Sequence, residues 1–495
     1  MTTNRFAPVA PLFATDAYKL GHIQQYTLAG EGRVTGVYAN YTNRSSLIPQ
    51  IDHVVHFGLQ AFIAGNLVAD FEPFFAADED EVCSLYEERV TSILGPNTIG
   101  SDHIRALHRR GHLPLRFCAV PEGTLVPIKV PSFTVENTDP EFYWLTNYIE
   151  TALSAGVWHP STTATIAHSY RQILQDWATK TGGPAAAVDF QAHDFSYRGQ
   201  TSDQSAAASG AGHLLSFQGT DSLVSLDWID RFYGGEYVAA SVPATEHSVM
   251  MAGIATIGER DMFSRLLDLY PTGIVSVVSD TFDLWRVLTD YLPTLKDKVL
   301  ARNGRLVIRP DSGNPADILC GTDAATGGDG PVERGVVELL WDIFGGTVND
   351  AGYRELDTHI GAIYGDSITR ERADEICKRL ADKGFASTNV VFGVGSYSYQ
   401  YVTRDTFGSA VKATWAEVDG HGFDLAKNPV TDSGTKKSAT GRLAVLRGED
   451  GELTLVQQAS AEQEAASLLQ PVWQDGEFLQ FQTFADVRDT LAGQV

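Results

Sequence analysis

Polar residues that could carry chemistry follow a series of short apolar segments in the middle of the chain. Arg309 and Asp311 come directly after the segment RLVI, while His247 and Asp280 follow two earlier segments. Arginine can hold a phosphate through two parallel hydrogen bonds, and an aspartate can accept hydrogen bonds from ribose hydroxyls. A histidine oriented by a carboxylate, here Asp280 or Glu246, can act as a general acid or base or as a nucleophile toward phosphorus. These residue types in this order point to a phosphosugar ligand.

Two further segment ends carry groups that suit a planar ligand. In the motif HDFSYRG, Phe195 could stack on a flat ring and Arg198 could meet a phosphate. Asp221 can only accept hydrogen bonds, so it would favour a ligand amide and repel a ligand carboxylate. Each residue also has a structural alternative: core packing for Phe195, a solvated charge for Arg198 and helix capping for Asp221. The corresponding alternatives are a turn-stabilising ion pair for Arg309 and a hydrogen-bonded structural role for His247, although their positions at segment ends favour function.

One segment of this acidic chain is basic. The 495 residues include 37 lysine and arginine against 62 aspartate and glutamate residues, a formal net charge of −25. This charge excludes a general attraction to nucleic acid or to an anionic membrane, so an anionic ligand must meet a local basic cluster. Residues 427–442, beginning with Lys427, hold four cations and one anion. Such a loop could bind polyphosphate, although a flexible solvated loop explains the composition equally well.

The apolar segments recur at intervals of about 30 residues and alternate with helical patterns, which predicts parallel strand–helix units. Residues 283–292 place apolar side chains at helical spacing, and Pro293 is expected to end that helix. Gly384 is expected to end a second helix within 367–385. The seven predicted strand segments are 188–195, 214–221, 236–247, 273–280, 305–313, 359–366 and 389–396.

Seven such units in succession favour an irregular (β/α) barrel over an open sheet. In barrels of this kind the active site lies at the C-terminal ends of the strands. Eight polar residues fall at those ends, so we expect all of them at one rim. They are His193, Asp194, Asp221, His247, Asp280, Arg309, Asp311 and Asp366. The expected fold class is therefore α/β, with a barrel of about seven parallel strands over residues 161–399.

The two ends of the chain have a different pattern. Strands are expected within 34–42 and 124–136, and helices within 141–156 and 163–180. Near the C-terminus two Asp-Gly pairs, each between apolar alternations, indicate β-hairpins. We expect residues 1–160 and 400–495 to form one α+β domain that flanks the barrel.

Several common motifs and signals are absent from the sequence. It contains no Walker phosphate-binding loop, no dinucleotide-binding glycine motif, no zinc-protease motif and no serine-hydrolase elbow. There is no apolar signal core at the N-terminus and no apolar stretch of about 18 residues, so we expect neither export nor a membrane-spanning helix. The cysteines are far apart and form no C-x-x-C, which favours reduced thiols in the cytoplasm. They are Cys83, Cys118, Cys320 and Cys377.

Taken together, the longer motifs resemble the nicotinamide phosphoribosyltransferase family over nearly the whole chain. In the family's order they are ATDAYKLGH, HDFSYRG, GTDS, SVPATEHS, SVVSDTFD, IRPDSGNP, YGDSI, TRD and KNPVTDSGTKKSATGRL. The resemblance implies condensation of nicotinamide with phosphoribosyl pyrophosphate to nicotinamide mononucleotide and pyrophosphate, a salvage step toward NAD. It also implies a cytosolic homodimer of the type II phosphoribosyltransferase fold with active sites shared between subunits. Mg²⁺ would be required, and ATP would be a co-substrate hydrolysed through a phosphohistidine.

The resemblance also assigns roles to individual residues. Phe195 and Tyr18 of the partner subunit would sandwich the pyridine ring, and Asp221 would bind its carboxamide. His247 would be the phosphorylated residue and Asp280 its orienting carboxylate. The other residues carried over would bind the phosphoribosyl group or its phosphates: Arg309, Asp311, Gly365, Asp366, Arg198, Gly395 and Ser396, with positive charge from Arg404 and Lys427 of the neighbouring subunit. Asp16 would be a further substrate-binding residue. No metal ligands are assigned.

One motif departs from the family, and three other functions stay open. The family's glycine-rich strand end has Ser396 and Tyr397 here, and the tyrosine would narrow a phosphate site.

A nicotinate phosphoribosyltransferase is the alternative enzyme, and Asp221 argues against it because a carboxylate should reject nicotinate. A catalytically silent binding protein on the same scaffold is a second alternative. A phosphosugar lyase or aldolase would need a Schiff-base lysine at a strand end, and the seven segments offer none.

Overall fold

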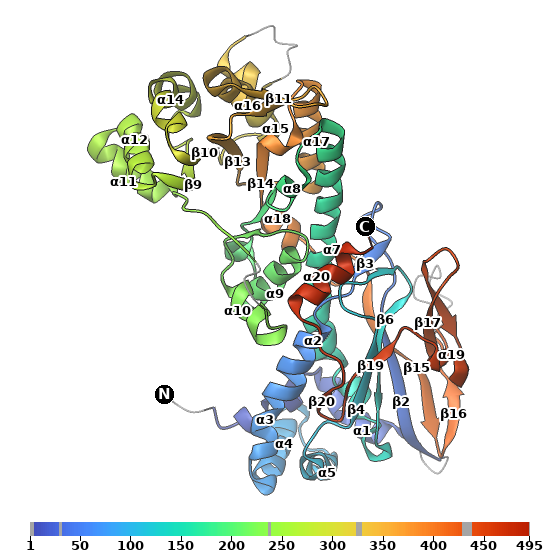
Figure 1. Cartoon of the computed structure of the whole chain (residues 1–495). Helices are drawn as coiled ribbons and strands as arrows, with labels where there is room; N and C mark the ends of the chain where they lie inside the picture. Colours follow the sequence, from blue (N-terminus) through green and yellow to red (C-terminus); the bar gives the residue numbers. More distant parts are fainter. Residues whose placement is uncertain (1–3, 29–31, 236–238, 323–328, 428–437, 495) are drawn as a thin grey trace. The chain divides into compact units, whose positions relative to one another are not determined.

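The computed structural model describes residues 4–28, 32–235, 239–322, 329–427 and 438–494. It divides the chain into two compact units, which we call the flanking unit and the barrel unit. The flanking unit comprises Met1–Thr165, Ile229–Gly235 and Val402–Val495, and the barrel unit comprises Ile166–Trp228 and Glu236–Tyr401. Figure 1 shows the elements of each unit, coloured along the chain.

The barrel unit is built on a six-stranded parallel sheet. Its strands, in spatial order, are β8 (Gly219–Thr220), β7 (Ala192–Asp194), β14 (Val390–Val394), β13 (Ile360–Tyr364), β10 (Asn303–Arg309) and β9 (Thr272–Val278). All five pairings along this order are parallel. Every residue of β13 is buried, as expected for a parallel strand covered on both faces. The predicted parallel α/β sheet is confirmed, and each of its strands falls on one of the seven predicted segments.

The third predicted segment, 236–247, is the exception because its described residues form no strand. Ala240 makes one isolated parallel bridge to Gly219 of β8, and Ala244 makes another to Ser276 of β9. The segment therefore connects the two edges of the sheet without a continuous ladder. Pro243 lies between the two bridges and has no N–H to donate, which accounts for the interruption. The sheet thus has six strands plus this bridging segment, where about seven strands were expected.

Helices follow the strands of the barrel unit. Those of eight residues or more are α9 (Asp203–Leu214), α11 (His247–Ile257), α12 (Glu259–Leu269), α14 (Leu292–Leu300), α16 (Pro331–Phe344) and α17 (Arg370–Asp382). Shorter ones include α8 (Ala185–Val188), α13 (Leu284–Arg286), α15 (Pro315–Cys320) and α18 (Ser396–Tyr399), and a small antiparallel pair is formed by β11 (Gly346–Val348) and β12 (Arg354–Leu356). Figure 1 shows α15, α16 and α17 beside β10, β13 and β14. α10 (Val224–Phe232) runs across the boundary between the units.

One predicted helix end is wrong and one is confirmed. Pro293 does not stop the helix that starts at Leu284, because a π-helical segment, Val287–Tyr291, leads directly into α14. Pro293 is the second residue of α14, and in the first turn of a helix a proline removes no hydrogen bond that the turn needs. The helix therefore continues to Leu300. Gly384 follows α17 with a φ of +76°, the left-handed conformation that ends helices.

An antiparallel sheet of eight strands forms the centre of the flanking unit. Its main order is β16 (His421–Asp424), β15 (Ser409–Val418), β2 (Gly32–Asn43), β6 (Pro131–Asn137), β4 (Leu115–Ala119), β19 (Gln470–Gln474) and β20 (Glu477–Phe478), and β1 (Thr27–Leu28) pairs with β2. Figure 1 shows β2, from the N-terminal part, beside β15, from the C-terminal part. Their antiparallel register runs from Ser409 opposite Asn43 to Val418 opposite Val34. The prediction that both chain ends build one α+β unit is confirmed.

Helices and aromatic side chains complete the flanking unit. Its elements outside the sheet include α1 (His22–Gln25), β3 (His53–Val55), α2 (Leu59–Phe62), α3 (Glu72–Ala76), α4 (Glu79–Leu94), α5 (Asp102–Arg110), β5 (Leu125–Pro127), α6 (Leu145–Tyr148), β17 (Leu443–Arg447), β18 (Leu453–Gln457), α19 (Ala461–Ala465) and α20 (Phe484–Ala492). The two helices predicted within 141–156 and 163–180 are largely one, α7 (Glu150–Thr181), which begins in the flanking unit and continues into the barrel unit. In the core, Tyr41 and Phe133 stack with ring centroids 4.8 Å apart. The four cysteines are free thiols.

Both predicted C-terminal hairpins are present. β17 pairs antiparallel with β18, and β19 pairs antiparallel with β20. In the second hairpin Asp475 and Gly476 have φ values of +51° and +96°. A two-residue hairpin turn of type I′ needs positive φ at both central positions, which the Asp-Gly pair supplies.

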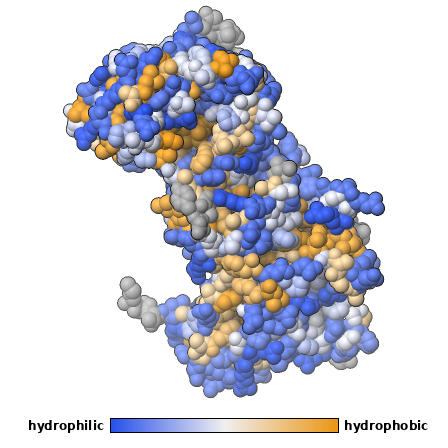
Figure 2. Space-filling model, viewed as in Figure 1, coloured by the Kyte–Doolittle hydropathy of each residue, from blue (hydrophilic) through white to orange (hydrophobic). Residues whose placement is uncertain are grey.

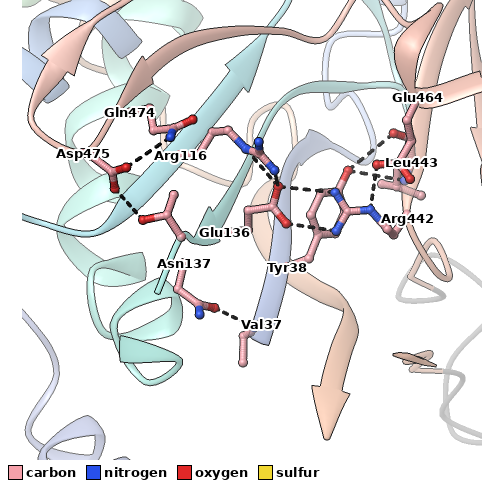
Figure 3. Close-up of polar contacts among 11 residues, drawn as sticks. Val37, Tyr38, Arg116, Glu136, Asn137, Arg442, Leu443, Glu464, Gln474 and Asp475 are labelled. Carbon is pink, nitrogen blue, oxygen red and sulfur yellow. Dashed lines mark hydrogen bonds and ion pairs between the residues drawn. The ribbon is translucent and has the colours of Figure 1, made fainter. Parts of the chain in front are cut away.

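A network of charged residues joins the sheet of the flanking unit to the segment before β17 (Figure 3). Glu136 of β6 accepts hydrogen bonds from Arg442 Nη1 at 2.9 Å and from Arg116 Nη2 at 2.6 Å. Arg442 Nε donates to Glu464 at 2.6 Å. Although burial opposes ionisation, the two arginines lower the pKa of Glu136. Arg442 was counted among the cations of the basic segment, and here two carboxylates engage its guanidinium; residues 428–437 of that segment lie outside the described residues.

We expect the Glu136→Gln substitution to lower the free energy of unfolding by about 2 kcal/mol near pH 7.5, because two partly exposed guanidinium groups lose the largely buried carboxylate that they share. The pKa of Glu136 is lower in the folded chain than in the unfolded chain. Its contribution is therefore present above the unfolded pKa and is lost as the pH falls through the folded value. Urea unfolding at about pH 7.5 and about pH 3.5 should show the difference from wild type shrinking at the lower pH. The exposed Glu449→Gln serves as the control, and an equal loss there would contradict the prediction.

Candidate active site

The carboxyl ends of β7 and β10 bring an aromatic ring, a guanidinium group and a carboxylate together. Arg309, the last residue of β10, donates to Asp311 through Nε at 3.3 Å and Nη2 at 3.1 Å. The guanidinium carbon of Arg309 lies 5.2 Å from the ring centroid of Phe195, which follows β7. This distance is typical of a cation–π contact. A flat ring and a phosphosugar could therefore be held side by side at this rim.

Two glycines allow these side chains to approach the backbone. A Cβ atom at Gly393 in β14 would lie 2.4 Å from Cδ2 of Phe195, and one at Gly365 would lie 2.5 Å from Oδ1 of Asp311. Neither distance is possible without displacement of the facing side chain. Gly365 was predicted as a site residue, whereas Gly393 was not. Gly393 precedes Gly395 and Ser396, the two positions predicted at this strand end, and only its contact with the Phe195 ring identifies it.

Asp221 presents a carboxylate near the same groups. Its Oδ1 accepts hydrogen bonds from His193 Nε2 at 3.0 Å and from Ser241 Oγ at 2.6 Å. Burial raises the pKa of Asp221, but the hydrogen bond and charge of His193, the hydroxyl of Ser241 and the charge of Arg309 outweigh it and lower the pKa. Asp221 is therefore ionised at neutral pH. An ionised carboxylate can accept a hydrogen bond from an amide and repels another carboxylate.

His247 and Asp280 form a pair at the next strand end. His247 Nε2 lies 3.3 Å from Asp280 Oδ1. The side chain of Asp280 is 6% exposed and that of His247 is 46% exposed, so a buried carboxylate faces a histidine open to solvent. The other oxygen of Asp280 accepts from the backbone N–H of Asp311 at 2.9 Å and from Ser312 Oγ at 2.6 Å. These contacts connect the histidine pair to the Arg309 and Asp311 pair.

The remaining barrel residues predicted for the site lie at neighbouring strand ends. Arg198 is exposed on the short turn Tyr197–Gly199, and a Cβ at Gly199 would lie 2.4 Å from the Cβ of Ser396 after β14. A Cβ at Gly395 would meet open space. The exposed Asp366 follows β13, and Tyr397 is exposed as well. Among the hydrogen bonds and ion pairs of the described residues, none joins Arg198 or Asp366 to Arg309 or Asp311.

Burial raises the pKa of the Tyr364 hydroxyl, and the charges of Asp366, Asp280 and Asp311 add to that effect. Those three carboxylates therefore lie within electrostatic reach of one hydroxyl, which donates to the carbonyl oxygen of Gly313 at 2.9 Å. Asp194, also predicted at the rim, is fully buried and accepts from the backbone N–H of Ser196 at 2.9 Å. Its carboxylate is a structural group at the end of β7.

The other predicted residues line a pocket of about 460 Å³ in the flanking unit. Asp16, Tyr18, Arg404 and Lys427 are among them, and Tyr18 is exposed. The same pocket holds Arg44, Glu150 and Lys412, which the sequence analysis did not identify because they stand singly in unremarkable strand and helix patterns. Burial lowers the pKa of Lys412, and Arg44, Lys427 and Arg404 lower it further against the opposing charge of Glu150. Four cations around one pocket suit a polyanionic ligand.

No three histidine, cysteine, aspartate or glutamate side chains among the described residues are grouped closely enough to hold a metal ion alone. Mg²⁺ in proteins is commonly bound by one or two carboxylates together with substrate phosphates. Asp280 and Asp311 provide oxygen donors of that type beside the Arg309 group. The site therefore suits a Mg²⁺ ion carried by a phosphorylated ligand.

Within the described part of the chain, no helix combines the length and apolarity that crossing a membrane requires.

The Gly393→Ala substitution is expected to raise the KM for the planar substrate about tenfold or more, because the new methyl group would displace the Phe195 ring. Steady-state kinetics with each substrate varied in turn would measure it. Gly361→Ala, in the neighbouring strand β13, is the matched control, because its Cβ would lie 3.3 Å from Cδ of Arg305, a flexible side chain away from the strand end. A similar KM for both variants and the wild type would contradict the proposed position of the ring.

Comparisons with known proteins agree on one family. Residues 190–477 match the model of the nicotinate phosphoribosyltransferase family. The chain is 48% identical over 501 aligned residues to the nicotinamide phosphoribosyltransferase of Acinetobacter baylyi, covering 98% of each chain. It is 35% identical to the protein of the same name from Mycoplasma pneumoniae, covering 87% of this chain and 94% of that one.

Solved structures agree with the fold. Human nicotinic acid phosphoribosyltransferase matches with a TM-score of 0.55 at 17% identity, covering 97% of this chain and 93% of that chain. A nicotinate-nucleotide pyrophosphorylase from Pyrococcus furiosus matches with a TM-score of 0.57 at 16% identity, covering 100% and 97%. At this level of identity the likeness shows the fold alone.

Proposed function

The chain belongs to the family of nicotinate and nicotinamide phosphoribosyltransferases, and we propose that it transfers the phosphoribosyl group of phosphoribosyl pyrophosphate to nicotinamide. The products are nicotinamide mononucleotide and pyrophosphate, so the reaction serves NAD salvage. The observation that carries this proposal is the Asp221 carboxylate, which accepts hydrogen bonds from His193 and Ser241 near the Phe195 and Arg309 pair. This arrangement offers a neutral carboxamide an acceptor and offers nicotinate a repulsive charge.

The reaction requires these residues to position the reactants and to stabilise developing charge. The pyridine nitrogen attacks C1 of the ribose while the bond to pyrophosphate breaks, through a state with oxocarbenium character, and no protein nucleophile on carbon is needed. Phe195 would hold the pyridine ring in line with C1, and Arg309 with Asp311 would hold the phosphoribosyl group. Arg309 would also stabilise the negative charge that develops on pyrophosphate. Mg²⁺ bound with that group, beside Asp280 and Asp311, would neutralise part of the charge.

We propose further that ATP assists the reaction through phosphorylation of His247. The solvent-open imidazole beside the buried Asp280 supports this role, because Nε2 can donate to the carboxylate and leave Nδ1 with a free lone pair. Attack of that nitrogen on the γ-phosphorus of ATP forms a nitrogen–phosphorus bond and releases ADP. Water later hydrolyses the bond and releases phosphate. The phosphorylated state adds negative charge beside Asp280, which favours Mg²⁺ and cationic side chains around the substrate phosphates.

A homodimer with shared active sites is also proposed. Apolar residues of α11, the helix that His247 begins, reach the surface of the barrel unit, namely Val249, Met251 and Ile257. Figure 2 shows apolar residues at the surface of the part of the chain that carries α11 and α12. Exposed apolar residues next to a functional group are typical of an interface. Mixing Tyr18→Ala and Arg309→Ala subunits tests sharing: random reassociation would restore about a quarter of wild-type activity, and no recovery in mixed dimers would contradict it.

A product assay tests the reaction. The chain is incubated with phosphoribosyl pyrophosphate and either nicotinamide or nicotinate, with and without ATP. We expect mononucleotide from nicotinamide, little from nicotinate, and a lower KM for nicotinamide when ATP is present. Equal efficiency with both bases would favour the alternative nicotinate enzyme and contradict the role of Asp221. No product with either base would favour a catalytically silent protein.

The phosphohistidine has a separate test. Incubation with γ-labelled ATP and Mg²⁺ should give acid-labile phosphate on the wild-type chain and none on His247→Ala. The matched control is His359→Ala, because His359 Nδ1 also contacts a carboxylate, Asp357 Oδ1 at 2.6 Å, elsewhere in the barrel unit. Label on His247→Ala, or none on the wild type, would contradict the role of His247.

A further inference from the structure

The carboxylate of Asp221 is held through only one of its two oxygens. His193 Nε2 at 3.0 Å and Ser241 Oγ at 2.6 Å both contact Oδ1. An ionised carboxylate accepts and cannot donate, so both neighbours must donate to that oxygen. In the described part of the chain no hydrogen bond reaches Oδ2, and the side chain is 46% exposed. Oδ2 is therefore the acceptor that remains open to a ligand.

The histidine is itself held in place by strand pairing. His193 lies opposite Gly219 in the pairing of β7 with β8, and a Cβ at Gly219 would be only 2.7 Å from Nδ1 of the imidazole. The imidazole also packs against Phe195, with ring centroids 4.9 Å apart. The backbone of Asp221 is anchored too, because its N–H donates to the carbonyl oxygen of Asp194 at 3.0 Å. Both ends of the His193–Asp221 contact are thus held by the sheet.

We propose that His193 and Ser241 are positioning residues for base selection: by donating to Oδ1 they turn Asp221 so that Oδ2 receives the carboxamide N–H of the base. They would thereby set the preference for a neutral amide over a carboxylate. The inference deepens the proposed function and depends on it. His193 comes from β7 and Ser241 from the segment that bridges β8 and β9, so the selection device spans three neighbouring parts of the sheet.

The contact between His193 and Asp221 affects the charge of the Asp221 carboxylate as well as its orientation. The charged groups that face Asp221 are His193 and Arg309, and the buried Asp194 lies behind its backbone. Burial alone would raise the pKa of Asp221, and the hydrogen bond of His193 opposes it. Without that donor the carboxyl group takes up a proton at higher pH. A protonated Asp221 no longer repels nicotinate, so discrimination should weaken as the pH falls.

Four variants separate hydrogen bonding from packing. His193→Phe keeps a ring against Phe195 but removes the donor, while His193→Gln keeps an N–H donor and removes the ring. Ser241→Ala removes the second donor with little change in volume, and Ser241→Thr retains a hydroxyl. We expect the KM for nicotinamide to rise about tenfold in His193→Phe and Ser241→Ala, with the KM for phosphoribosyl pyrophosphate unchanged and partial recovery in the donor-retaining variants.

A pH profile supplies the second measurement. In His193→Phe, use of nicotinate relative to nicotinamide should increase as the pH falls from about 8 to about 6, and in the wild type the ratio should stay level. The proposal is overturned if the donor-lacking variants keep the wild-type KM for nicotinamide, or if they lower kcat equally for both bases at every pH. Mononucleotide formation by the wild-type chain is scored in the same assay. Its absence would refute the proposed function, whereas an active wild type with unaffected variants would refute only this inference.

Discussion

Replacing Arg309 by lysine should lower kcat/KM for mononucleotide formation about a hundredfold, or about 2.7 kcal/mol of transition-state stabilisation. Lysine keeps the charge and loses the planar fork that donates twice to Asp311. It also loses the delocalised face that lies 5.2 Å from the Phe195 ring centroid. A cation–π contact of about 0.5–1 kcal/mol and a charged hydrogen bond of about 1.5–3 kcal/mol together account for an effect of this size.

Steady-state kinetics and a thermal unfolding curve on the same sample provide the measurement. The matched control is Arg305→Lys, on the same strand, where Nε of Arg305 donates to the carbonyl oxygen of Thr358 away from the strand end. We expect Arg305→Lys to retain most of the activity. If Arg309→Lys were within threefold of wild type, or if Arg305→Lys lost as much, Arg309 would not hold the phosphoribosyl group.

The Asp221→Ser substitution should change the preference between nicotinamide and nicotinate by at least about a hundredfold. Two effects add in this ratio. The loss of a carboxylate acceptor weakens binding of the carboxamide, and the loss of a negative charge removes the repulsion of nicotinate. The freed His193 and Ser241 would be left with donors that suit a ligand carboxylate, so nicotinate gains while nicotinamide loses.

Competition between the two bases for one pool of phosphoribosyl pyrophosphate would measure this ratio directly. Asp227→Ser, an exposed aspartate on α10, removes the same charge at a position with no role in the site and should leave the ratio unchanged. A preference that survives in Asp221→Ser would mean that base selection resides elsewhere. A shift of equal size in Asp227→Ser would mean that the effect is one of overall charge.

Local patterns predicted the fold where a single element accounts for its own structure. The alternation of apolar segments and helices predicted the parallel sheet, and the Asp-Gly pairs predicted both C-terminal hairpins. Pro293 shows where such reasoning fails, since a π-helical segment before it allows the helix to continue. The strand predicted around Pro243 is wrong for a related reason. Its composition is typical of a strand, but the segment only makes single bridges to the two edge strands of the sheet.

The sequence by itself determined the residue types at the strand ends, their order, and the family resemblance, because parallel strand–helix units place every carboxyl strand end at one edge. Only the tertiary structure decided which of these side chains meet. It pairs Asp280 with both His247 and the Asp311 backbone, directs two donors to one oxygen of Asp221, and leaves Asp194 buried. It also adds Arg44 and Lys412 to the basic pocket and makes Gly393 a contact of Phe195. Those choices depend on strand register and on the space between side chains far apart in the chain, which spacing along a sequence does not contain.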